Sequence, residues 1–223
     1  LVANISHDLR TPLTLITGYA EVMRDLPDEN TPENIQIIID EATRLSTLVN
    51  DVLDLSKLQA GVVSLKKRVY NLTSSVRGIL TRYTKMTDYH IVFYASEEVY
   101  ICADELKISQ VIYNLVNNAM TYTGKDKSVV LRQRVEEGKV RISVSDTGEG
   151  IPQDKLNDIW ERYYKVDKAH KRAQVGTGLG LAIVKHIAIQ HQALLSMKSK
   201  PGEGTKITVS FPVFQEPHNS SAS

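Results

Sequence analysis

The sequence predicts an α+β protein in which a helical hairpin precedes an α/β sandwich, a mixed sheet with helices on one face. Three observations support this fold class. Apolar residues recur at spacings of three and four in the first part of the chain, which is the period of a helix. From about Val69 the pattern changes to shorter elements in which polar and apolar residues alternate. The later elements include two adjacent hairpins, which favour a mixed sheet over a purely parallel one.

Two amphipathic helices are predicted first. The opening helix has one apolar stripe: Leu9, Leu13, Ile16, Ala20 and Met23. Residues 26–30 interrupt it, and Thr31 and Pro32 supply an N-cap and a first helical residue for the next helix. That second helix has two overlapping stripes: Ile35, Ile38, Ala42, Leu45, Val49 and Val52, and Leu45, Leu48, Val52 and Leu55. Because one partner helix cannot cover both, we expect a homodimer in which two chains form a four-helix bundle.

The second part of the chain is predicted to alternate strands and helices. We expect Gly61 to end the hairpin and residues 59–63 to act as a hinge. Strands are expected at residues 66–70, 90–95, 128–135, 139–145, 194–199 and 205–211, and helices at 72–87, 104–121 and 177–190. The domains are placed at 1–65 and 66–214, with a disordered polar tail at 215–223.

Composition limits the classes of function. The net charge of the 223 residues is +1, which gives no electrostatic indication of nucleic acid or of an anionic membrane as a partner. The single cysteine, Cys102, is compatible with a reducing compartment such as the cytoplasm. No apolar run reaches the roughly 20 residues that span a bilayer. Since the chain opens at Leu1 inside a helical pattern, we interpret it as a piece of a longer protein whose membrane-spanning region lies upstream.

A histidine beside an acid stands near the start of the chain. His7 falls two residues away from the apolar stripe at Leu9, so it should be exposed, with Thr11 one turn below it. Asp8 could accept a hydrogen bond from one ring nitrogen and leave the other free to attack. Pro12 cannot bond the carbonyl of Asp8 and should loosen or bend the helix. Taken alone, such a pair is common on surface helices.

Three later segments carry groups suited to a nucleotide. Asn114 and Asn118 lie one turn apart on a helix, where amide oxygens could hold Mg²⁺. Asp146 ends a strand before Gly148 and Gly150 and could accept a hydrogen bond from an amine such as that of adenine. Glycines at 176, 178 and 180 enter a helix whose N–H groups would favour phosphate. Each segment alone also fits an ordinary helix surface or turn.

Taken together and in this order, the segments resemble sensor histidine kinases of bacterial two-component systems over nearly the whole chain. The matching segments are residues 6–13 for the phosphoacceptor box, 114–123 for the N box, 146–151 for the first glycine box, 159–167 for the F box and 176–181 for the second glycine box. The resemblance implies that ATP phosphorylates His7, with Asp8 as acid–base partner. It also implies transfer to an aspartate of a response-regulator receiver domain, and Asp8 and Thr11 match residues that serve dephosphorylation of the regulator.

The resemblance further implies which residues bind ATP and Mg²⁺. Asn118, with Asn114 nearby, would bind the metal ion. The nucleotide-binding residues would be Asn114, Asn118, Tyr122, Asp146, Gly148, Gly150, Ile151, Arg162, Tyr164, Lys165, Gly176, Thr177, Gly178, Leu179, Gly180 and Thr205. Residues 167–175 would form a lid whose basic side chains approach the phosphates, or else an ordinary solvated loop.

The chain departs from the family pattern at two places. Trp160 and Tyr163 stand where Phe is usual, and this change preserves bulk. Thr121 stands where a Lys or Arg commonly lies near the phosphates, so activity should be lower than typical unless another cation replaces it. The candidates for that cation are Lys125, Arg162 and Lys165.

Two rival functions remain at this point. ATPases of the gyrase, HSP90 and MutL kind share the expected pocket, but they place a Glu where Asn114 stands, and an amide cannot take a proton from water. A catalytically inactive scaffold that senses nucleotide is favoured only by Thr121. Incorporation of phosphate would separate the kinase from the scaffold.

Overall fold

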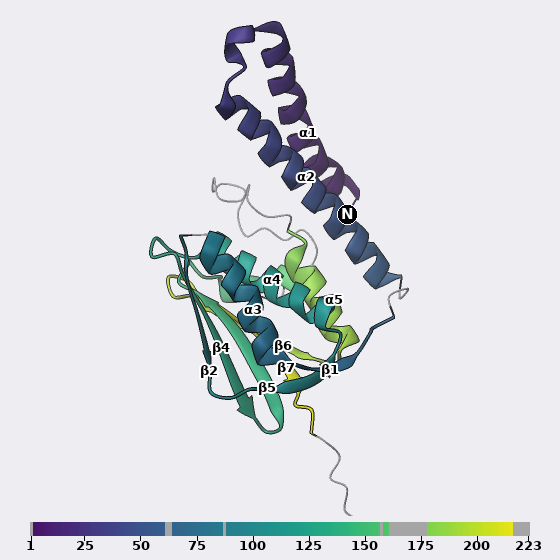
Figure 1. Ribbon diagram of the computed structural model, residues 1–223, viewed down its shortest axis with the longest axis vertical. Coiled ribbons are helices and arrows are strands. Elements are labelled where there is room, and N and C mark those ends of the chain that lie inside the picture. The colour runs from purple at the N-terminus through teal and green to yellow at the C-terminus, as the bar shows by residue number, and fades with distance from the viewer. Residues whose placement is uncertain (1, 61–63, 87, 157, 161–177, 216–223) are drawn as a thin grey trace, which may run out of the picture.

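The computed structural model describes residues 2–60, 64–86, 88–156, 158–160 and 178–215. A long helical hairpin lies against a domain of one main sheet and three helices, as Figure 1 shows. This arrangement confirms the predicted α+β fold class. Within the described ranges, no helix is long and apolar enough to cross a membrane.

The hairpin consists of α1 (Val2–Asp25), a short 3-10 turn η1 (Pro27–Glu29) and α2 (Pro32–Gln59). Thr31 caps α2 as expected, because its side-chain oxygen accepts a hydrogen bond from the Asn34 N–H at 3.2 Å. Helix α1 runs without interruption through Pro12, so the predicted loosening does not break it.

The stripe predicted for α1 is only partly correct. Leu9, Ile16 and Met23 are half-buried, but Leu13 is 54% exposed and Ala20 is exposed. Pro12 is buried in place of Leu13, and Tyr19 is half-buried in place of Ala20. Because the proline ring is apolar, it can occupy the face turned toward α2, which shifts two members of the stripe by one residue.

Helix α2 has two apolar faces as expected, but their members differ from the predicted stripes, because the exposed face includes Ile39 and Leu53, which neither stripe contained. Leu48, Leu55 and Leu58 are buried. The second face is exposed, and we call it the outer seam: Ile35, Ile39, Val49 and Leu53, with 41%, 49%, 42% and 50% exposure. No described residue of this chain covers these four side chains.

The main sheet has the strand order β2-β4-β5-β7-β6. Its strands are β2 (His90–Ala95), β4 (Ser128–Glu136), β5 (Lys139–Asp146), β6 (Leu194–Lys200) and β7 (Gly204–Pro212). Strands β2 and β4 are parallel and the other neighbours are antiparallel, so the sheet is mixed as predicted.

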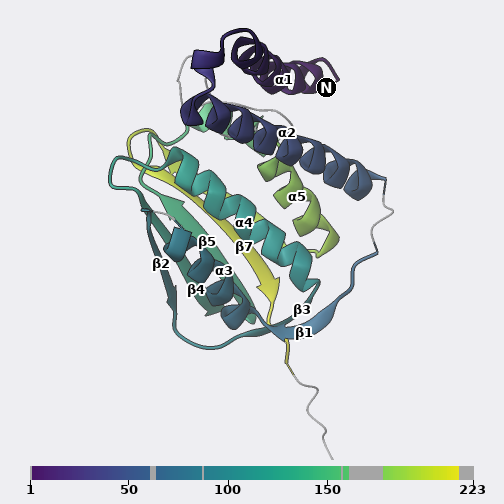
Figure 2. The same ribbon diagram turned by 45° about the horizontal axis from the view of Figure 1, so that its top comes forward.

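Three helices lie over one face of this sheet (Figure 2): α3 (Leu72–Met86), α4 (Glu105–Tyr122) and α5 (Gly180–Gln190). Their apolar sides and the inner side of the strands form the core, which includes Val111, Leu131, Ile142 and Ile183. Helix α5 starts at Gly180, three residues later than the expected Thr177, which lies outside the described residues.

A second, two-stranded sheet pairs β1 (Arg68–Asn71) with β3 (Tyr100–Ala103). The sequence analysis missed β3, which has four residues and lies directly before the Asp104 cap of α4. Two short 3-10 turns, η2 (Gln153–Lys155) and η3 (Asp158–Trp160), follow β5.

The hairpin contacts the sheet domain through the C-terminal half of α2. Leu55 and Leu58 join the core of the sheet domain, and α2 packs on α5. The Gln110 side-chain amide donates a hydrogen bond to Asp54 Oδ2 at 2.8 Å, which links α4 to α2. Helix α1 lies on the side of α2 that faces away from α5 (Figure 2).

The face of the sheet opposite the helices is exposed and rich in basic side chains, and we call it the open face: Arg132, Arg134, Arg141, Lys198 and Lys206. Cross-strand partners share a face of a sheet. Arg134 lies opposite Arg141, and Lys198 lies opposite Lys206. Like charges therefore meet twice across this face. The net charge of the whole chain, +1, does not reveal this local concentration of positive charge.

Candidate functional site

His7 is exposed on α1, as predicted. Its side chain is 79% exposed, and Nδ1 lies 3.6 Å from Oδ1 of Asp8, whose side chain is 22% exposed. This is the sideways approach expected of adjacent residues, slightly longer than a hydrogen bond. Among the described residues, none forms a hydrogen bond with Nε2, so that nitrogen could act as a nucleophile.

Thr11 lies one turn below the histidine and is exposed. Its hydroxyl donates a hydrogen bond to the His7 carbonyl oxygen at 3.2 Å. Pro12 supplies no N–H for the Asp8 carbonyl, which would otherwise receive the next bond of the helix. The backbone below His7 therefore has one helical bond fewer, although the helix continues.

Helix α4 brings Asn114 toward the start of α5. A Cβ built on Gly180 would lie 3.3 Å from Asn114 Oδ1, so the N box and the second glycine box are in contact. Asn118, one turn further on, is half-buried, and its side chain forms no hydrogen bond with any described residue. Its amide oxygen is a hard ligand of the kind that Mg²⁺ prefers.

The residues present fit a magnesium ion that is held partly by substrate. Among the described residues, no group of three or more His, Cys, Asp or Glu side chains could form a metal cage. Mg²⁺ commonly uses few protein ligands together with substrate phosphates and water. The amides of Asn114 and Asn118 suit that mode.

Asp146 ends β5 and is held by two backbone groups. Its Oδ1 accepts hydrogen bonds from the Gly148 N–H at 2.9 Å and the Thr205 N–H at 3.2 Å. Burial raises the pKa of the Asp146 carboxyl, while these N–H groups act in the opposite direction. A carboxylate has about four acceptor positions, so a further donor such as an exocyclic amine can be accommodated.

The glycines around Asp146 are required by close backbone approach. A Cβ on Gly148 would lie 1.9 Å from the Tyr122 carbonyl oxygen, and one on Gly204 would lie 2.1 Å from that of Asp146. A Cβ on Gly150 would lie 2.0 Å from the Lys200 carbonyl oxygen. Three segments therefore meet here: the end of α4, the loop after β5 and the turn between β6 and β7.

Hydroxyl groups hold these segments together. Ser199 Oγ accepts a hydrogen bond from the Ile151 N–H and donates one to the Gly204 carbonyl oxygen, both at 2.8 Å. Thr123 Oγ1 donates to the Ser128 carbonyl oxygen at 2.7 Å and lies 3.0 Å from Thr147 Oγ1. The sequence analysis did not identify Ser199, Gly204 or Thr123 as site residues.

The described part of the second glycine box comprises Gly178, Leu179 and Gly180. Leu179 is buried and makes no side-chain hydrogen bond to cap α5. The N-cap residue therefore supplies no side-chain acceptor to the N–H groups of the first turn of α5. N–H groups at a helix start favour phosphate, and here the helix starts beside Asn114.

Several predicted site residues cannot be placed. Arg162, Tyr164, Lys165, Gly176 and Thr177 lie outside the described residues, together with the proposed lid at 167–175 and Gly61 of the hinge. Thr121 is described, and its hydroxyl donates to the Asn117 carbonyl oxygen at 2.8 Å. Lys125, one of the cations that could replace the missing one, is exposed nearby in sequence.

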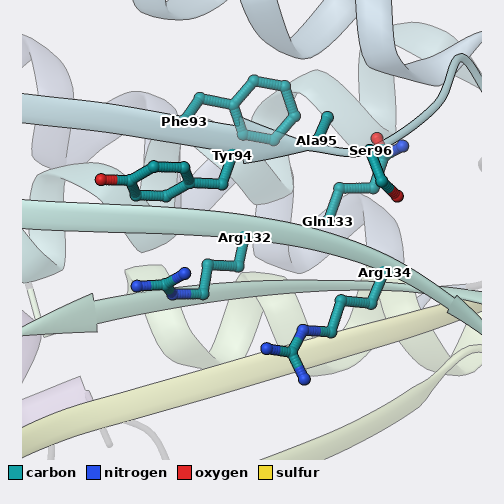
Figure 3. Close-up of a pocket in the computed structure, with 7 residues that line it drawn as sticks. All are labelled: Phe93, Tyr94, Ala95, Ser96, Arg132, Gln133 and Arg134. Atoms are coloured by element: carbon teal, nitrogen blue, oxygen red, sulfur yellow. The ribbon is translucent and has the colours of Figure 1, made fainter.

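Two surface hollows differ in their relation to the site. One of about 290 Å³ is lined by Asp146, Gly204 and Thr205, so it reaches the candidate nucleotide site. A larger one, about 470 Å³, lies on the open face beside Tyr94, Arg132 and Arg134 (Figure 3). The Arg132 guanidinium carbon lies 4.6 Å from the centre of the Tyr94 ring. The lining of this larger hollow includes none of the residues of the candidate nucleotide site.

Comparison with known proteins gives two family matches. Residues 1–61 match the His Kinase A (phospho-acceptor) domain, and residues 103–215 match the histidine kinase-, DNA gyrase B- and HSP90-like ATPase family. The chain belongs to the sensor histidine kinases. The first match covers the hairpin, and the second begins within the sheet part of the fold, after β1, α3 and β2.

This histidine kinase chain is 34% identical to the sensor protein SrrB of Staphylococcus aureus over 219 residues, which cover 95% of the chain and 37% of SrrB. The chain thus spans little more than a third of that relative. Among solved structures, full-length ShkA in complex with AMPPNP is 26% identical with a TM-score of 0.70, covering 96% of this chain and 46% of ShkA. ThkA in complex with the response regulator TrrA has 24% identity and a TM-score of 0.75, covering 96% and 61%. ThkA thus supports the fold.

Proposed function

We propose that this chain transfers the γ-phosphoryl group of ATP to His7 and then to an aspartate of a response-regulator receiver domain. The observation that carries the proposal is the combination of an exposed His7–Asp8 pair with a second site built from Asn114, Asp146 and the start of α5. Histidine kinases bound to AMPPNP and to a response regulator, among the structural relatives, support the same nucleotide and the same kind of partner.

In this proposal, different residues bind the adenine, the phosphates and the metal ion. Asp146 accepts a hydrogen bond from the adenine amine, and the first turn of α5 donates N–H groups to the phosphates. Asn118 and Asn114 would hold Mg²⁺, which neutralises phosphate charge when it is bound. Gly148, Gly150, Ile151 and Thr205 shape the pocket, while Tyr122 lies at the end of α4 beside it.

At His7, the Nε2 lone pair attacks the γ-phosphorus, the bond from that phosphorus to the bridging oxygen breaks, and ADP leaves. Nδ1 carries the proton of the neutral ring and faces Asp8. Asp8 accepts that proton as the ring becomes positively charged. We also propose that Asp8 and Thr11 serve dephosphorylation of the regulator, because both stay on the exposed side of α1 near His7.

Movement or a second subunit is needed to bring the two sites together. In the structure, α2 lies between α1 and the sheet domain (Figure 2). We propose that chains pair through the outer seam of α2 into a homodimer, and that residues 59–63 act as the hinge. The same proposal divides the chain into domains at 1–65 and 66–214 with a tail at 215–223. It also places the chain on the cytoplasmic side of a membrane sensor.

The test is incubation with Mg²⁺ and γ-labelled ATP, comparing the native chain with His7→Gln. We expect an acid-labile, base-stable phosphoryl group that is absent from the variant. The matched control is His90→Gln, which changes another exposed histidine on β2 and should leave labelling intact. Label that persists in His7→Gln would mean another nucleophile, and nucleotide binding without label would favour the scaffold function.

A further inference from the structure

A buried polar cluster lies at the end of α4 opposite the nucleotide site. Its centre is formed by Asp104, the N-cap of α4, and His191, the residue directly after α5, each only 7% exposed. Neither residue belongs to the site described above. Burying a polar side chain costs free energy unless the side chain is hydrogen-bonded, so both residues should have hydrogen-bond partners.

The bonds of His191 join the ends of two helices. Its Nε2 accepts a hydrogen bond from the backbone N–H of Asp104 at 3.1 Å, and its Nδ1 lies 2.9 Å from the Ile187 carbonyl oxygen. Because Nε2 accepts an N–H, the ring proton must be on Nδ1, which donates to Ile187. The neutral ring therefore bridges the end of α5 and the start of α4.

The carboxylate of Asp104 extends this bridge to the linker. Oδ1 accepts the Lys107 N–H at 3.2 Å and caps α4. Oδ2 accepts the Lys66 N–H at 2.9 Å, so it holds the chain just before β1. One residue thus connects α4, α5 and the segment that leads from the hairpin.

The two helices are joined a second time at the nucleotide site. Asn114 of α4 contacts Gly180 at the start of α5, while His191 at the other end of α5 contacts the cap of α4. Since a helix is a rigid element, fixing one end of α5 against α4 restricts the position of its other end. The buried pair can therefore determine how Asn114 and the first turn of α5 meet.

We propose that Asp104 and His191 are positioning residues that hold α4 and α5 in the relative placement required for nucleotide binding, and that tie this placement to the linker from the hairpin. The inference rests on the proposed function for its nucleotide readout. It goes beyond that function because neither residue contacts the nucleotide site.

Burial, hydrogen bonds and nearby charges together shift the pKa values of His191 and Asp104. Burial lowers the pKa of His191, the Ile187 carbonyl and Asp104 act in the opposite direction, and Lys67 adds to the lowering. Burial opposes ionisation of Asp104, but the N–H groups of Lys66 and Lys107 and the nearby His191 outweigh it and lower its pKa. Tyr70 lies near Asp104, and it also interacts with Glu105 and Arg68.

Protonation of His191 would therefore disrupt the bridge. A proton on Nε2 would face the Asp104 N–H, so two donors would oppose each other. Because burial lowers the pKa of His191, this change belongs at a pH below the ordinary histidine range. The neutral form stabilises the folded arrangement at neutral pH, and that contribution is lost as pH falls below the ordinary histidine value.

The test measures affinity for a fluorescent ATP analogue with Mg²⁺ between pH 8 and pH 5.5. His191→Phe keeps a ring but forms neither bond, and it should bind about tenfold more weakly at pH 7.5. His191→Gln places an oxygen where Nε2 stood and cannot be protonated, so it should bind within about threefold of the native chain. Toward the acidic end of this range, the native chain should lose affinity more steeply than His191→Gln.

The matched control is His186→Gln. His186 is on the same helix, and its Nδ1 lies 2.9 Å from the Ala182 carbonyl oxygen, but it forms no hydrogen bond to another element among the described residues. The control should keep native affinity and the native pH profile. Hydrogen exchange of the Asp104 amide provides a direct readout and should accelerate in His191→Phe alone.

Native affinity in a folded His191→Phe, or an unchanged loss of affinity at low pH in His191→Gln, would overturn the proposal. If His191→Phe does not fold, the pH profile of His191→Gln still decides. A chain that binds the analogue but incorporates no phosphate would contradict the proposed kinase activity while leaving these binding results to decide the positioning role.

Discussion

At the scale of single residues, the nucleotide site depends on positions that have no room for a side chain. Gly148→Ala should lower the free energy of unfolding by about 3 kcal/mol, because its Cβ would collide with the Tyr122 carbonyl. Gly78→Ala is the matched control, since a Cβ there meets nothing within 4 Å and α3 is helical. It should raise stability by about 0.5–1 kcal/mol in urea unfolding followed by circular dichroism. Equal effects of the two changes would contradict the close approach.

Asp146 is predicted to separate stability from nucleotide binding. In Asp146→Asn the amide oxygen can still accept hydrogen bonds from the Gly148 and Thr205 N–H groups. The NH₂ group, however, is a donor and would face the adenine amine, which is also a donor. ATP affinity should fall about 10- to 100-fold, measured by calorimetry. Asp154→Asn, an exposed control after β5, should bind normally.

The stability of the same variant has a defined pH dependence. A carboxyl whose pKa is raised on folding binds its proton more tightly in the folded state. The native chain therefore gains stability from this group as pH falls through the raised pKa toward the ordinary carboxyl value. Asp146→Asn should lack that gain and should be at least as stable as the native chain at pH 7. A marked loss of stability at pH 7 would mean that the charge itself supports the fold.

Part of the site could be predicted residue by residue. Asp146 and Gly148 were identifiable because a carboxylate and glycines follow a strand within a few residues. Ser199, Gly204 and Thr123 were missed, since their contacts join segments far apart in the chain, and a Ser, Thr or Gly in a turn has many local explanations. His191 was missed because a histidine after a helix gives no indication of its partner 87 residues away.

At the scale of elements, α2 provides the clearest prediction. Val49 lies on the outer seam, so Val49→Asp would bury a charge in the proposed bundle and raise the dimer dissociation constant about 100-fold or more. Thr47→Asp adds the same charge at an exposed position two residues before Val49, which the helical period places on nearly the opposite side of α2, and it should leave the dimer intact. Light scattering over a concentration series measures both. A native-like dimer in Val49→Asp would place the interface elsewhere.

Long periodic elements were predictable, and short or shifted ones were not. Helix α2 and strands β4 and β5 agree with the sequence analysis because their patterns extend over many residues. Strand β3 has four residues, too few for alternation to be distinctive. In α1, apolar periodicity could not determine whether Pro12 or Leu13 faces α2, because both side chains are apolar and adjacent in the chain.

At the scale of the whole molecule, the proposed autophosphorylation requires either movement between the hairpin and the sheet domain or a second subunit. Gly61→Pro should reduce autophosphorylation about tenfold and leave ATP affinity within about twofold, because proline stiffens the proposed hinge without touching the pocket. Gly61→Ala, which keeps more backbone freedom, is the control. Equal losses of phosphorylation and affinity would exclude the hinge.

The arrangement of the two domains could be predicted only in part. The sequence indicated a hairpin, a linker and a sheet domain, but not that Leu55 and Leu58 would be buried in the core of the sheet domain. Apolar residues at the end of α2 satisfy a helical stripe whichever surface they contact. The Asp54–Gln110 hydrogen bond joins residues 56 positions apart, and neither has a neighbouring motif that indicates its partner.

The basic open face has a consequence for how the molecule turns in solution. Arg141 is paired with Glu136 and Glu137, but Arg132, Arg134, Lys198 and Lys206 give the side of the sheet away from the helices a positive local potential, although the net charge of the chain is only +1. A negatively charged surface exerts a torque on such a body before contact, over a range of about 8 Å at physiological salt. The sheet would turn toward that surface, and the hairpin with His7 would face the open solution.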